Sequence, residues 1–200
     1  MIRLAARLTS ALISLFALAL TATHMMPPAS PLTSLLMPSP GCSGSGLCFM
    51  GIYPGLTTIE QAVALLRAHP WVGAVDAHLA YQVSWTWSGA QPAFIDASVP
   101  GTIMERTYAY VTLIRFNTLY NYGDVWLQLG APEEGYALRQ PGGMLHGIYY
   151  PRHALLAINL LPCPARIVDF WRTPVAIQLG DAFVLLDRDY DESSVHLRTC

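Results

Sequence analysis

The 200-residue sequence contains no lysine, and all 11 of its basic residues are arginine. Charged residues make up 12% of the chain, against a usual share of about 25%. The formal net charge is −2. Because a chain of this composition has no basic stripe to contact phosphates, we expect no nucleic-acid partner. Hydrophobic residues make up 53%, which excludes intrinsic disorder.

Charge is missing altogether from residues 8–59. Arg3 and Arg7 precede an almost unbroken apolar run over residues 8–22, a pattern typical of a secretory signal peptide. Extended to residue 26, the run approaches the ~20 residues that span a bilayer. We therefore predict that residues 1–26 are a signal peptide or a single N-terminal membrane anchor. Both alternatives place the body outside the cytoplasm, secreted or tethered, with membrane contact only through this segment.

Residues 27–46 have the composition of a linker. They contain five prolines and end in a Gly/Ser cluster. Proline-rich chain is semi-extended and Gly/Ser-rich chain is flexible. We predict a spacer between the export segment and a folded body that begins at residue 47.

Four cysteines, an even number, fit two disulfides in an exported protein. They are Cys42, Cys48, Cys163 and Cys200. Cys42 and Cys48 either close a local loop or tie the start of the body to the other two. The cysteines form no CxxC pair, and no histidine lies at ligand spacing from any of them, so we predict no zinc site.

The body begins with a helix and then alternates like a sheet. Thr57 or Thr58 is the predicted N-cap of a helix that ends before Pro70, with an apolar stripe that includes Ala62 and Leu66. Residues 81–88 alternate strictly between apolar or aromatic and polar side chains, which predicts a half-buried strand. Further strands are predicted over 93–97 and 108–116.

The same pattern recurs in the second half of the chain. Residues 116–132 align with 54–70 without a gap, so we predict a second copy of the helix. Strands separated by turn residues follow over 136–139, 144–150, 154–160, 175–179 and 182–187, with a short helix or turn at 165–171. The predicted fold is α+β, with two tandem units of one helix plus an antiparallel meander, over residues 47–116 and 117–200.

Two motifs carry a resemblance to a known family. Gly55-Leu56-Thr57 opens the first helix, and the second runs from Asp124-Val125 to Leu129-Gly130-Ala131-Pro132. These motifs resemble the G-[ML]-T…V…LG-x-P signature of the SmpA/OmlA lipoproteins, which share a helix-plus-sheet unit with the tandem-repeat β-lactamase-inhibitory protein. The chain has no lipid-attachment cysteine after the apolar run. The resemblance implies a binding or scaffolding protein of the bacterial envelope, without an active site.

Motifs for catalysis and cofactors are missing. The chain has no GxSxG nucleophile elbow between a strand and a helix and no HExxH. Residues 187–192 contain three aspartates on alternate positions, but the EF-hand glycine and final glutamate are absent. We predict no metal and no cofactor.

Aromatic side chains are the remaining candidates for a binding surface, because their rings offer large contact areas with polar edges. The candidates for contacts to an envelope protein, a peptide or a glycan are Tyr81, Trp85, Trp87, Trp126, Tyr149 and Tyr150. Packing of the same rings in the core is the alternative.

The sequence thus predicts an exported, non-catalytic binding or envelope-scaffolding protein. The alternative is an exported hydrolase whose polar residues converge only in space. Its candidate residues are Asp76, Asp96, Asp124, His146 and His153.

Overall fold

The computed structural model describes residues 12–16, 32, 42, 48–79, 81–105 and 109–180. Met1–Ser30 form one compact unit and Pro31–Cys200 another. Residues 12–16 are helical with exposed side chains. The rest of the predicted export segment lies outside the described residues. Among the residues that are described, no helix combines the length and the apolar character needed to cross a membrane.

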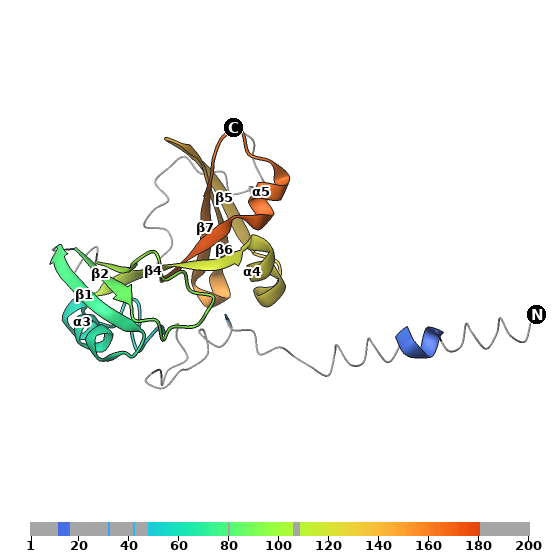
Figure 1. Ribbon diagram of the computed structural model, residues 1–200. Helices are drawn as coiled ribbons and strands as arrows, with labels where there is room; N and C mark the ends of the chain where they lie inside the picture. Colours follow the sequence, from blue (N-terminus) through green and yellow to red (C-terminus); the bar gives the residue numbers. More distant parts are fainter. Residues whose placement is uncertain are drawn as a thin grey trace, which may run out of the picture. The chain divides into compact units, whose positions relative to one another are not determined.

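The second unit is an eight-stranded antiparallel sheet with short helices (Figure 1), which confirms the predicted α+β class. The sheet order is β1-β2-β3-β4-β8-β7-β6-β5. In chain order the elements are α3 (Ile59–Ala68), β1 (Val72–Leu79), β2 (Gln82–Trp87), β3 (Gly101–Glu105), β4 (Val111–Asn121), α4 (Tyr122–Leu129), β5 (Glu134–Gln140), β6 (Gly143–Tyr150), η1 (Pro151–His153), β7 (Leu155–Leu161), α5 (Ile167–Arg172) and β8 (Pro174–Gly180).

Reciprocal side-chain caps start the first two helices of this unit. Thr58 accepts from the backbone N–H of Gln61, whose side chain accepts from the Thr58 N–H. Asn121 and Asp124 form the same capping box at the start of α4. Each box satisfies two N–H groups that a helix start leaves without partners. The predicted N-cap at Thr58 is confirmed, and a helix lies within the predicted second copy.

The centre of the sheet is the antiparallel pair of β4 and β8. Phe116 lies opposite Ile177, and Arg115 lies opposite Gln178. From this pair outward, β3, β2 and β1 follow on one side and β7, β6 and β5 on the other. The pair β4–β8 therefore joins a first half of the sheet, β1–β4, to a second half, β5–β8.

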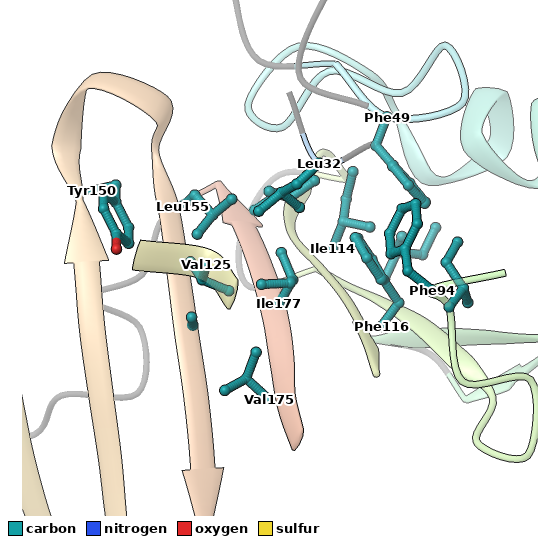
Figure 2. Packing of buried hydrophobic residues seen from close by; sticks show 14 of the residues in the cluster. Leu32, Phe49, Phe94, Ile114, Phe116, Val125, Tyr150, Leu155, Val175 and Ile177 are labelled. Atoms are coloured by element: carbon teal, nitrogen blue, oxygen red, sulfur yellow. The ribbon is translucent and has the colours of Figure 1, made fainter. Parts of the chain in front are cut away.

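One face of the sheet, here called the first face, carries the main core. Its side chains pack with buried residues of α3, α4 and α5, including Leu66, Val125 and Phe170. Figure 2 shows side chains of this cluster, among them Leu32, which is fully buried. The backbone N–H of Leu32 donates to Gln128 Oε1 at 3.3 Å. Two described residues of the predicted linker, Leu32 and Cys42, are therefore buried.

Some predicted strands need correction. Residues 93–97 form no strand but a turn, with one isolated bridge between Ile95 and Thr118. Asp96 accepts from the backbone N–H and the hydroxyl of Ser98, which competes with extended pairing. Strand β4 runs past the predicted end at Phe116, because its pairing with β8 extends to Asn121. Strands β1 and β3 were not predicted, and residues 182–187 lie outside the described residues.

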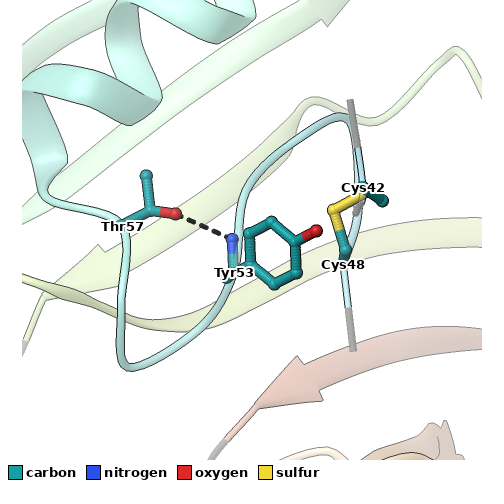
Figure 3. The surroundings of a disulfide bond; sticks show 4 residues. All are labelled: Cys42, Cys48, Tyr53 and Thr57. Atoms are coloured by element: carbon teal, nitrogen blue, oxygen red, sulfur yellow. Dashed lines mark hydrogen bonds between the residues drawn. A yellow bond between two sulfur atoms is a disulfide. The ribbon is translucent and has the colours of Figure 1, made fainter. Parts of the chain in front are cut away.

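Cys42 and Cys48 form a disulfide (Figure 3), which is the local-loop alternative. The bridge precedes the turn into α3, where the backbone N–H of Tyr53 donates to Thr57 Oγ1 at 2.8 Å. Cys163 is also disulfide-bonded. Cys200 lies outside the described residues.

Candidate functional site

The six aromatic residues predicted to bind a partner do not share one surface. Trp85 and Tyr150 are 1% and 3% exposed and belong to the core of the first face. Tyr149, next to Tyr150 in the strand, lies on the opposite face against a smaller cluster. Trp126 contacts Trp171, with ring centroids 5.3 Å apart. Tyr81 is exposed in the turn between β1 and β2.

Trp85 and Trp87 position the start of β3. Their rings meet edge to face, with centroids 5.5 Å apart. The Trp85 indole occupies the space where a Cβ of Gly101 would lie, so only glycine allows this approach. Trp87 Nε1 donates to the carbonyl oxygen of Val99 at 3.0 Å. The two indoles thereby hold the segment from Val99 to Gly101 against the sheet.

The second face of the sheet is the one opposite α3, α4 and α5. Strand pairing places Ser84, Thr102, Arg115 and Gln178 side by side across β2, β3, β4 and β8. Directly paired residues in a sheet point to the same side, with Cβ atoms about 5 Å apart. We call these four residues the Arg115 row. In the first half of the sheet, the second face is therefore polar along this row.

A pocket lies on the second face beside this row. It has a volume of about 390 Å³, within the range of small-molecule sites. The strands form its floor and the Val99–Pro100 segment forms part of its wall, so the indoles of Trp85 and Trp87 support it. The lining residues are Gln82, Val99, Pro100, Thr102, Met104, Leu113, Arg115 and Asn117.

Arg115 is the one charged side chain among the described residues that line the pocket. It is exposed to solvent, and within the described residues no carboxylate pairs with it. Partial dehydration lowers the pKa of Arg115, and the Tyr136 phenol raises it by a smaller amount. An arginine stays protonated under all ordinary conditions. As far as the described residues go, the pocket therefore presents a positive charge without a carboxylate partner.

Two buried polar groups accompany Arg115 on the second face. Gln178, its direct neighbour in β8, is 1% exposed, and neither amide atom has a hydrogen-bond partner in the part of the chain that the structure describes. The Tyr136 hydroxyl also lacks a partner there. The Tyr136 ring lies over Gly147. Burial raises the pKa of Tyr136, while the Arg115 charge opposes this to a smaller extent, so the two groups interact electrostatically.

The residues of the alternative hydrolase are dispersed. Asp124 caps α4, and Asp96 is held by Ser98. Asp76 lies on β1 and His146 on β6, six strand positions apart, or nearly 30 Å at about 4.8 Å per strand. His153 lies in η1. Within the described ranges, no group of three or more His, Cys, Asp or Glu side chains is arranged to hold a metal ion. The predicted acidic cluster at 187–192 lies outside those ranges.

Sequence reasoning missed Arg115 and Gln178. One signal was present, because Arg115 is the only charged residue between Arg106 and Asp124 and stands within an apolar strand pattern. Its opposite residue, Gln178, was hidden because pairing between β4 and β8 is a property of the tertiary fold.

Comparison of the chain with protein families, curated proteins and solved structures found no match.

Proposed function

We propose that the protein is an exported, non-catalytic binding protein that holds its ligand in the Arg115 pocket. The observation that carries this proposal is a guanidinium that has no carboxylate partner among the described residues and that lies in a concave site of about 390 Å³. Among the described residues, the lining contains amide, hydroxyl and apolar groups beside Arg115, a set suited to recognition. No carboxylate, imidazole or thiol is placed among them to act as a general base or nucleophile.

Export is supported by two features. The apolar N-terminal run has the pattern of a signal peptide or anchor. The Cys42–Cys48 bridge is of the kind that persists in oxidising compartments. The proposal also includes the envelope-binding role that the SmpA/OmlA resemblance implies.

The proposal includes two tandem units within the body. Helix α3 precedes the meander β1–β4, and α4 precedes β5–β8, with α5 inserted before the last strand. Each set of four strands contributes its last strand to the centre of the sheet. This mirrored order supports a repeat of one helix-plus-sheet unit.

A ligand screen on the full chain tests the binding function. Small carboxylates, amines and neutral compounds are screened by ligand-observed NMR against the wild type and against Thr102→Phe, which fills the pocket. The matched control is Leu127→Phe, at a side chain of α4 that is 87% exposed. We expect binders that Thr102→Phe loses and Leu127→Phe keeps.

Each binder is also recovered after incubation and checked for chemical change. Recovery of unchanged compounds supports a non-catalytic role. Binding that survives in Thr102→Phe places the ligand elsewhere and refutes the proposal. Conversion of a compound by the wild type, abolished in Thr102→Phe, contradicts the non-catalytic part.

A further inference from the structure

We infer that the Arg115 pocket recognises a small monocarboxylate with an apolar body. The inference rests on the proposed binding function and adds the chemical class of the ligand. It is drawn from the charge and the lining of the site.

The charge of the site matches a single negative charge. Arg115 supplies one guanidinium, and no other cation is among the described lining residues. The planar fork of a guanidinium matches the two oxygens of a carboxylate, and one charge balances the other. A phosphate monoester carries up to two negative charges near neutral pH, so it would leave negative charge beside Met104 and Leu113. The site therefore favours a carboxylate.

The lining also separates into a polar and an apolar part. Thr102 and Asn117 flank Arg115 on β3 and β4 with hydrogen-bonding side chains. Met104 and Leu113 are directly paired apolar neighbours in the lining, and Met104 is the more accessible of the two. Val99 and Pro100 add apolar wall. A ligand with its carboxylate at Arg115 can thus cover apolar surface with a short hydrocarbon body.

Gln178 is the direct neighbour of Arg115 in β8. Its amide has no hydrogen-bond partner in the described part of the chain, and its strand position is directly opposite Arg115. Gln178 is 1% exposed and is not among the residues that line the pocket, so it is placed beside the site and not within it. We therefore assign Gln178 as a positioning residue that packs next to Arg115 from the neighbouring strand.

A methionine in the pocket provides the measurement. In the full chain labelled with ¹³C at the methionine methyl groups, Met104 reports on the pocket. Met144, on β6 and 8% exposed, serves as the internal control and as a check that each variant is folded. Hexanoate, hexanamide and hexyl phosphate are titrated separately. We expect hexanoate to shift the Met104 signal at about tenfold lower concentration than the other two compounds.

Substitutions test whether hexanoate binding depends on the residues of the Arg115 pocket. Arg115→Gln is expected to weaken hexanoate binding about tenfold or more, since it removes a charge-assisted pair, while Gln178→Leu weakens it a few-fold. Arg172→Gln, which removes an exposed arginine on α5, leaves binding unchanged. Should Arg115→Gln disturb the Met144 signal, Thr102→Asp keeps the guanidinium and places a carboxylate directly opposite it. This variant is expected to abolish hexanoate binding.

The results separate this inference from the function it rests on. Equal binding of hexanamide, stronger binding of hexyl phosphate, or unchanged hexanoate binding in Arg115→Gln overturns the monocarboxylate assignment. The binding function survives those results if screened compounds still depend on the pocket. Hexanoate could also have no effect on the Met104 signal, as expected if the pocket binds only acidic side chains of a partner protein. That result also overturns the assignment.

Discussion

The two halves of the sheet use the second face in opposite ways. In the first half, Thr102 and Arg115 are at least partly accessible and border a pocket. In the second half, Leu156, Ile158 and Tyr136 form a small buried cluster on the same side of the sheet. The change occurs between Arg115 on β4 and Gln178 on β8, which is already buried.

This difference shows that strand order alone does not decide whether the second face is polar and accessible or apolar and buried. Both halves place four antiparallel strands in mirrored order. What separates them is the side chains on the second face, where Thr102 and Leu156 occupy the same cross-strand row on either side of Arg115 and Gln178. A polar, accessible row can receive a ligand, whereas an apolar, buried row contributes to stability.

The largest expected effect comes from placing the same charge in both halves. Leu156→Asp puts a carboxylate at a fully buried position. We expect this variant to lower the free energy of unfolding by more than about 3 kcal/mol or to prevent folding. Thr102→Asp puts the carboxylate opposite Arg115, where the two groups form an ion pair. We therefore expect the free energy of unfolding to stay within about 1 kcal/mol of the wild-type value. Urea unfolding of both variants measures the difference. Equal costs would show that the two halves do not differ in burial.

A smaller effect is expected where the Tyr136 ring lies over Gly147 in the second half of the sheet. Gly147→Ala places a Cβ within the Tyr136 ring, so we expect the free energy of unfolding to fall by about 1–3 kcal/mol. In a Tyr136→Leu background the same change costs less, because the ring is absent. A double-mutant cycle by thermal unfolding gives the coupling. Strict additivity would argue against the close approach of ring and backbone.

The smallest effect concerns the pH dependence of stability. Burial raises the pKa of Tyr136, so its neutral form stabilises the fold below about pH 10, and this contribution is lost as the pH rises further. Tyr136→Phe removes this alkaline loss, which amounts to about 1 kcal/mol between pH 9 and 11. The control Tyr81→Phe, at an exposed position, keeps the wild-type profile. Identical profiles for all three proteins would refute the prediction.

The sequence predicted the elements whose signals are local. The capping residue Thr58 and the apolar stripe through Ala62 and Leu66 predicted α3. Strict alternation predicted β2, where Val83 and Trp85 are buried. Strands β1 and β3 escaped prediction because β1 is rich in Gly and Ala and β3 has five residues, including Gly and Glu, so neighbouring strands rather than propensity define them.

The pocket could not be predicted for a similar reason. Aromatic residues attracted attention because of their size, yet Trp85 packs in the core and Trp87 supports the pocket wall. The side chain that gives the pocket its charge, Arg115, is marked in the sequence only as a single charge within an apolar strand pattern. Its importance arises from its neighbours, which come from β3 and β8.

The pairing of β4 with β8 has a consequence for the order of folding. Arg115 and Gln178 are paired although 178 − 115 = 63 residues separate them. Contacts between distant residues require a large loop to close, and they form late and slowly compared with meanders of neighbouring strands. We expect the hairpins of each half to form first and the central pair last. The complete Arg115 row would then arise in the final step, whereas the described pocket lining comes from β2, β3, β4 and the Val99–Pro100 segment, so the first half of the sheet can form the pocket before β8 is in place.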